Sequence, residues 1–120
     1  MQVSKKKINK NLENQFFKLL YQVIADIHHP KEAEIVLKDI LQNTELKVTA
    51  KRLAIAYWLD KGRSYKDIKT NLAVSSATIS GIAEKMKKKA GIEIALQKIR
   101  SEEWAARWAK KISKTFKIKK

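Results

Sequence analysis

The chain has 120 residues, which is enough for one domain of modest size. Hydrophobic residues make up 44% of it and can supply a core, whereas 32% of the residues are charged. No apolar run approaches the roughly 18 residues of a membrane span, so we expect no membrane insertion. The Lys-rich start lacks the apolar segment of a signal peptide. Cysteine is absent, which excludes disulfides and thiolate metal sites.

The net charge is the strongest compositional signal. The 27 basic and 12 acidic residues give +15, and self-repulsion of this size favours a polyanionic partner, with nucleic acid first. The excess is uneven, with net charges of +1 in 31–62, +5 in 63–91 and +6 in 92–120. We therefore expect 31–62 to be scaffold and the C-terminal half to face the polyanion. The expected location is the cytoplasm, in association with the nucleoid.

The N-terminal half carries apolar residues at helical spacing. One helix is predicted from Leu12 to Ile27 and ends before Pro30, because the residue before proline avoids the α region. A short helix follows over about 31–41. Thr44 is predicted to cap a third helix, which runs to Gly62. Gly62 is expected to end this helix in a left-handed backbone conformation.

The third predicted helix is apolar on two sides. Leu53 and Tyr57 belong to one stripe, and Ile55 and Leu59 belong to another. A helix buried on two sides in so small a chain needs a neighbour on each side, and a second copy can supply one. We therefore expect a homodimer.

Two short helices with a tight connection are predicted after Gly62. Ser64-x-x-Asp67 reads as a capping box for a helix to about Asn71, and Ser75 or Ser76 caps the next helix, which ends near Gly91. The spacing of apolar residues fits a helix-turn-helix, although Ala73 stands where a turn glycine is common. These apolar contacts are Ile68, Leu72, Val74, Ile79 and Ile82. The alternative is a generic pair of amphipathic helices with a solvated lysine face.

The second of these helices begins with small, hydrogen-bonding residues, which suit an N-terminus inserted in the major groove. Basic residues around it suit the flanking phosphates. The predicted phosphate contacts are Arg63, Lys66, Lys69, Thr78, Lys85, Lys87 and Lys88.

The C-terminal segment holds two apolar stripes on opposite sides of a straight helix. Ile92, Ala95, Leu96 and Ile99 form the first, and Trp104, Trp108, Ile112 and Phe116 form the second. We therefore predict a break at Arg100-Ser101, with Ser101 as an N-cap, which makes six or seven helices in an all-α chain. The second stripe could pack on the core, pair with the dimer mate or lie on an anionic membrane. A second nucleic-acid contact is compatible with these roles, through Arg107, Lys110, Lys111, Lys114 and Lys117.

Three segments between Lys51 and Ser80 match the pattern of a known family. They are Lys51-Arg52-Leu53, the connection from Leu59 to Ile68, and Ser76-Ala77-Thr78-Ile79-Ser80. This stretch resembles the Trp repressor family, and within it the small Trp-repressor-related proteins of bacteria. The resemblance covers about 12–91. It implies an intertwined all-α homodimer that binds double-stranded DNA as a transcriptional repressor, each subunit presenting one helix-turn-helix to half of an operator. The implied base contacts are Ser75, Ser76, Ala77 and Ser80.

The resemblance also bears on regulation. In the Trp repressor, one arginine of the third helix and one of the recognition helix bracket the indole ring of L-tryptophan. Arg52 matches the first, but Gly81 stands where the second is expected. Arg52 and Gly81 therefore mark a candidate effector pocket, and we expect no cofactor and no dependence on L-tryptophan.

The organisation expected from these patterns has three parts: a basic flexible arm at 1–10, a Trp-repressor-like helix-turn-helix domain at 11–91, and a basic aromatic helical extension at 92–120. No catalytic or metal site is expected, because adjacent residues such as His28-His29 or Glu102-Glu103 point in different directions on a helix. An RNA-binding or ribosome-associated protein, and a protein that binds a membrane surface or a partner through the C-terminal helix, are the alternative functions. The deep, narrow major groove of double-stranded RNA cannot admit a recognition helix, which favours DNA.

Overall fold

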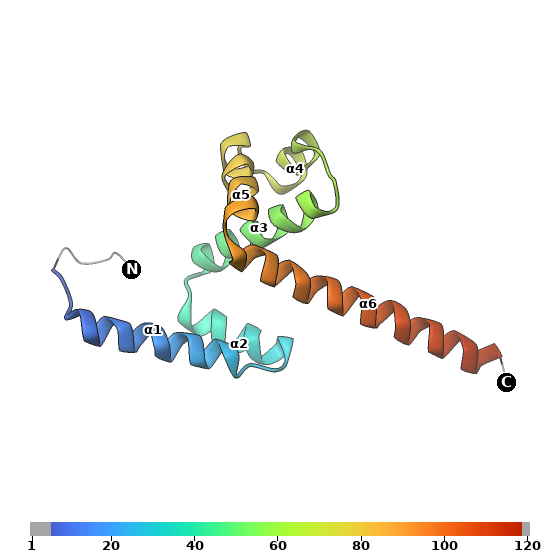
Figure 1. Ribbon diagram of the computed structural model, residues 1–120, viewed down its shortest axis with the longest axis horizontal. Coiled ribbons are helices and arrows are strands. Elements are labelled where there is room, and N and C mark those ends of the chain that lie inside the picture. The colour runs from blue at the N-terminus through green and yellow to red at the C-terminus, as the bar shows by residue number, and fades with distance from the viewer. Residues whose placement is uncertain (1–5, 119–120) are drawn as a thin grey trace. The chain divides into compact units, whose positions relative to one another are not determined.

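The computed structural model describes residues 6–118, and beyond Ile112 it describes only the side chain of Lys114. Within this range the chain forms six α-helices and no strand (Figure 1), which confirms the all-α prediction. Lys5 of the predicted arm and the side chains of Phe116 and Lys117 lie outside the described residues. The helices fall into two compact units, and the boundary between them in the sequence follows Leu46.

The first unit contains α1 (Lys10–Ala25) and α2 (Pro30–Ile40). The Asn9 side chain caps α1, because its Oδ1 accepts hydrogen bonds from the backbone N–H groups of Asn11 (2.9 Å) and Leu12 (3.3 Å). Pro30 begins α2, where its missing N–H costs nothing because the first helical N–H groups have no intrahelical partner.

Neither α1 nor α2 contains a buried residue, although both carry many apolar side chains. Phe16 is 52% exposed and Leu19 is 65% exposed. The two helices of the first unit therefore do not form a hydrophobic core within one chain.

Helix α3 (Asn43–Asp60) begins one residue before the predicted cap Thr44, so this prediction was wrong. The backbone N–H of Gln42 donates to Glu45 Oε1 at 2.8 Å. The side chain at the third helical position thus accepts a hydrogen bond from the residue that precedes the helix. Thr44 thus lies inside the first turn. At the other end Gly62 has φ = +82°, and the predicted left-handed conformation is confirmed.

The second unit is built from most of α3, together with α4 (Tyr65–Leu72), α5 (Ser76–Lys88) and α6 (Ala90–Ile118). Each of these helices supplies at least one buried residue to its core. The core residues are Ile55, Ala56, Ile68, Ile79, Ile82 and Leu96. The other predicted stripe of α3 is covered only in part: Tyr57 packs against this core, whereas Leu53 is 43% exposed.

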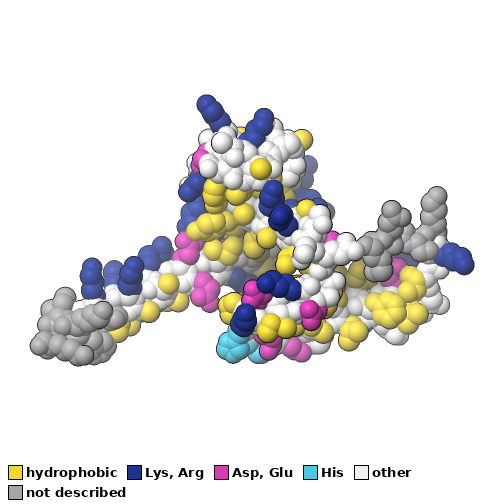
Figure 2. Space-filling model, turned by 180° about the vertical axis from the view of Figure 1, so that it is seen from behind, with side chains coloured by type: hydrophobic (Ala, Val, Ile, Leu, Met, Phe, Trp, Pro, Cys, Tyr) yellow, Lys and Arg dark blue, Asp and Glu magenta, His cyan; other side chains and the backbone are white. Residues whose placement is uncertain are grey.

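Helix α6 is continuous from Ala90 to Ile118, so the predicted break at Arg100-Ser101 and the Ser101 cap were wrong. Two apolar stripes on opposite sides of a straight helix predict a break only if both must join one core. Here they share one helix, because only the first stripe joins the core: Leu96 is buried, whereas Trp104 is 60% exposed. Figure 2 shows hydrophobic side chains along one edge of this helix and Lys and Arg side chains along the other.

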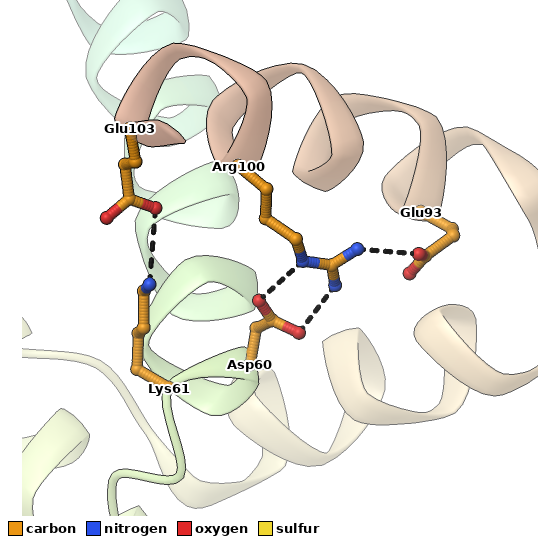
Figure 3. Close-up of polar contacts among 5 residues, drawn as sticks. All are labelled: Asp60, Lys61, Glu93, Arg100 and Glu103. Atoms are coloured by element: carbon orange, nitrogen blue, oxygen red, sulfur yellow. Dashed lines mark hydrogen bonds and ion pairs between the residues drawn. The ribbon is translucent and has the colours of Figure 1, made fainter. Parts of the chain in front are cut away.

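Polar contacts attach α6 to the end of α3 (Figure 3). The Arg100 guanidinium donates to both carboxylate oxygens of Asp60, at 3.2 Å from Nε and 2.6 Å from Nη2, and to Glu93 at 2.9 Å. One turn further, Lys61 Nζ lies 3.2 Å from Glu103 Oε1, and the Tyr57 hydroxyl donates to Glu103 Oε2 at 3.1 Å. These hydrogen bonds lower the pKa of Asp60, through Arg100, and the pKa of Glu103, chiefly through Lys61.

Candidate nucleic-acid interface

Helices α4 and α5 are joined by residues 73–75 and held together by buried isoleucines. Ala73 adopts the left-handed conformation (φ 53°, ψ 54°), which is why a glycine is common at this point of the turn. Ile68 of α4 and Ile79 of α5 are both fully buried, and Ile82 is nearly so. This arrangement is a helix-turn-helix, and it leaves the outer face of α5 exposed.

The N-terminus of α5 carries the predicted base-contacting residues. Ser75 is the N-cap, and its Oγ accepts a hydrogen bond from the Thr78 N–H at 3.1 Å. Ser76, Ala77 and Ser80 follow on the exposed surface, and neither serine has a side-chain hydrogen bond among residues 6–118. The structure therefore brings these three residues together on a free face, whereas the Ser75 hydroxyl is already engaged in capping the helix.

The predicted phosphate-contacting residues lie on α4 and α5 and in the connection before α4. Lys66 and Lys69 are exposed on α4, and Lys85, Lys87 and Lys88 are exposed in the last turns of α5. The Thr78 hydroxyl lies 2.8 Å from Ser75 Oγ, so it shares a hydrogen bond with the cap. Arg63 directly precedes Ser64, the N-cap of α4, and its guanidinium stacks on the Trp58 ring.

One exposed residue of α5 was missed by the reasoning from sequence. Glu84 lies one turn beyond Ser80 and two turns beyond Ser76, so the three share a helical face. A carboxylate there can accept a hydrogen bond from the amino group of cytosine. Lys88 Nζ lies 3.1 Å from Glu84 Oε2 and offsets part of the charge. The spacing of four residues along α5 was the signal in the sequence that could have found it.

The candidate effector residues are only partly brought together. Arg52 lines a pocket of about 280 Å³ between α3, α5 and the start of α6, whose walls include Ala56, Ile82 and Ile92. Gly81 is not among its lining residues, and Lys85, one turn further along α5, supplies the second cation of the lining. The pocket is thus mostly apolar, with two positive groups.

A larger hollow of about 720 Å³ lies elsewhere, along α6 between Lys61 and Arg107. It is broad and open, and the side chain of Trp104 forms part of its wall. No residue of α4 or α5 lines it, so it is separate from the helix-turn-helix.

The short turn at 73–75 and the packing of α4 on α5 through Ile68 and Ile79 place this unit in the helix-turn-helix class of proteins. A family model described as Trp repressor protein matches residues 14–99, well over half of the chain. The chain belongs to the Trp repressor family, which is regulatory and DNA-binding rather than enzymatic. The match ends at Ile99, so it does not include the exposed tryptophans of α6.

Comparisons with curated proteins and with solved structures found no match. No helix in the described part of the chain is both long enough and apolar enough to cross a membrane.

Proposed function

We propose that the protein is a sequence-specific transcriptional repressor that reads the major groove of duplex DNA with the N-terminal half of α5. The single observation that carries this proposal is the exposed, unpaired face formed by Ser76, Ala77 and Ser80 on a helix that Ile79 and Ile82 anchor in the core. Small side chains at this point let the helix approach the base edges closely. The lysines of α4 and α5 contact the phosphates on either side.

The functional unit in this proposal is a homodimer. The support comes from the first unit, where α1 and α2 bury no residue and expose Phe16 and Leu19, and from the uncovered Leu53 of α3. Exposed apolar surface of this extent favours association. Two recognition helices about 34 Å apart would then enter successive major grooves of a palindromic operator.

Light scattering on the full chain at micromolar concentration tests the dimer. The expected mass is about twice 13.8 kDa. Leu19→Glu should give the monomer mass with the helical signal in circular dichroism retained, because Leu19 is 65% exposed within one chain. A monomer of the unsubstituted protein would remove the basis for a palindromic operator.

A salt titration of duplex binding tests the DNA-binding function. If a dimer neutralises about 6–10 phosphates, its affinity should fall roughly 10³–10⁵-fold between about 50 and 200 mM salt. Fluorescence anisotropy with a labelled duplex measures this fall, and a duplex RNA of the same sequence is the matched control. Equal binding to both duplexes would favour the RNA-binding alternative.

We further propose that the protein acts in the cytoplasm, on the nucleoid.

We also propose that DNA binding is independent of L-tryptophan. An indole ring between two guanidinium groups gains roughly 0.5–2 kcal/mol from each. Gly81 has no side chain, and Lys85 at the pocket lacks the planar group that stacks on an indole. The pocket beside Arg52 therefore lacks the second guanidinium plane that would hold an indole.

One observation favours a second candidate function, binding to an anionic membrane surface through α6. Trp104 and Trp108 stack at 6.0 Å on an exposed edge, and Lys110 and Lys114 are exposed on the same helix. A helix with tryptophans on one face and lysines on another can lie in the headgroup region. Co-sedimentation with vesicles of anionic lipid, compared with vesicles of neutral lipid, tests this candidate. Equal recovery with both would contradict it.

A further inference from the structure

The connection between α3 and α4 folds Arg63 back onto the last turns of α3. The Gly62 N–H donates to the Leu59 carbonyl and the Arg63 N–H donates to the Trp58 carbonyl, both at 3.0 Å. These two hydrogen bonds form a Schellman motif, in which the side chain after the left-handed glycine contacts the residue five positions earlier. In most proteins that contact is between apolar residues. Here it joins Arg63 to Trp58.

The contact is a stacked cation–π pair. The guanidinium carbon of Arg63 lies 4.0 Å from the centroid of the Trp58 ring. In addition, Arg63 Nη1 donates to Asp67 Oδ2 in the first turn of α4 at 3.3 Å. The arginine is therefore held by a residue of α3 and a residue of α4, although its side chain is 46% exposed.

This arrangement leaves most of the guanidinium available. A guanidinium has five N–H donors at its edge, and stacking uses only its face. Among residues 6–118, Asp67 is the only hydrogen-bond partner of the Arg63 side chain. An ion pair at such an exposed position is weak, so it does not prevent a phosphate from using the remaining donors.

We propose that Trp58 is a positioning residue for the contact between Arg63 and a DNA phosphate. By holding the guanidinium against the protein before DNA arrives, Trp58 reduces the side-chain freedom that is lost on binding. Within residues 6–118, Lys66 and Lys69 of α4 have no such ring contact. Lys61 lies over the Tyr57 ring but is paired with Glu103 of α6, so Arg63 is the preordered cation directly before α4. This inference rests on the proposed DNA-binding function.

A double-mutant cycle on the full chain tests the proposal. The variants are Trp58→Leu, Arg63→Ala and the two combined, and the probe is a labelled duplex of random sequence, because a phosphate contact does not depend on the operator. Trp58→Leu should weaken binding about two- to tenfold, the range expected when one side chain loses its rotamer freedom only on binding. The same substitution should have no effect in the Arg63→Ala background. The DNA affinity of Trp58→Phe should lie between those of the unsubstituted protein and Trp58→Leu, because phenylalanine keeps a weaker ring contact.

Two controls separate positioning from packing. Trp104→Leu removes an exposed tryptophan of α6 and should show no coupling to Arg63. The NMR signal of the Arg63 Nε–H should move upfield in the shielding cone of Trp58, and this shift should disappear in Trp58→Leu. The thermal stability of Trp58→Phe should equal that of the unsubstituted protein. The NMR measurement needs no DNA.

Equal weakening by Trp58→Leu in both backgrounds, or an Arg63 signal without a ring-current shift, would overturn the positioning role while DNA binding by the unsubstituted protein stands. No duplex binding by the unsubstituted protein would instead overturn the proposed function, and with it this inference.

Discussion

The Ser75 hydroxyl and Thr78 form a closed cap at the start of α5: Ser75 Oγ accepts the Thr78 N–H at 3.1 Å and lies 2.8 Å from Thr78 Oγ1. The next residue, Ser76, is exposed and makes no side-chain hydrogen bond within the described chain. Two adjacent serines therefore differ: the Ser75 hydroxyl is engaged within the protein, and the Ser76 hydroxyl is free for the proposed contact with DNA.

Substitution of each serine should distinguish the two hydroxyls. Ser75→Ala should lower the free energy of unfolding by about 1 kcal/mol, because the Thr78 N–H loses its acceptor. Ser76→Ala should leave the stability unchanged within about 0.5 kcal/mol, as is usual at exposed sites. Urea titrations followed by circular dichroism measure both values. A larger loss for Ser76→Ala than for Ser75→Ala would mean that Ser76 is the capping residue.

Two glycines should respond in opposite directions to a methyl group. Gly81 lies inside α5, and a Cβ there would meet no atom within 4 Å, so Gly81→Ala should raise the free energy of unfolding by roughly 0.5–1 kcal/mol. Gly62 has φ = +82°, so Gly62→Ala should lower it by roughly 1–2 kcal/mol. Thermal unfolding of the two variants measures these changes, and each variant is the control for the other because both add one methyl group. A destabilised Gly81→Ala would indicate a close neighbour of α5 outside the single chain.

The contact between α3 and α6 should depend on acid pH. The pKa values of Asp60 and Glu103 are lowered in the folded chain by Arg100 and Lys61. Their stabilising effect is therefore complete above the unfolded values, about 3.9 for Asp and 4.3 for Glu, and is lost as the pH falls through the lower folded values.

The variant Asp60→Asn with Glu103→Gln removes both charges and measures this effect. The unsubstituted protein should be more stable than the variant from pH 5 to 8, and the difference should shrink below about pH 4. Thermal unfolding across this range provides the curve. A stability difference that stays constant down to pH 3 would contradict the prediction, because it would not depend on the ionisation of Asp60 and Glu103.

L-Tryptophan should neither bind nor alter DNA affinity. The physical reason is Gly81, which leaves Arg52 without a guanidinium partner across an indole. Isothermal calorimetry with L-tryptophan, together with a gel shift in its presence and absence, provides the measurement. Micromolar binding accompanied by tighter DNA binding would make the protein tryptophan-responsive.

Local signals were sufficient for much of the fold. The cap Ser64 and the left-handed Gly62 could be predicted, and the α5 cap could be narrowed to Ser75 or Ser76, because each depends on a few neighbouring residues. The continuity of α6 could not be predicted, because it depends on which apolar stripe meets the core, and the bridge from Arg100 to Asp60 spans 40 residues of sequence. The role of Lys85 in the pocket was likewise hidden, because it depends on where α6 begins relative to α3.

The most direct test of the central claim, that the N-terminus of α5 reads DNA, is the affinity of Ser76→Glu for an operator selected from random duplexes. A carboxylate at this exposed first position of α5 is compatible with the helix start but repels the DNA phosphates and base acceptors. Ser101→Glu, an exposed serine on α6 with the same change of charge, is the matched control. The account predicts loss of specific binding for Ser76→Glu and near-normal binding for Ser101→Glu, with the helical signal unchanged in both. Specific binding that survives in Ser76→Glu would contradict it.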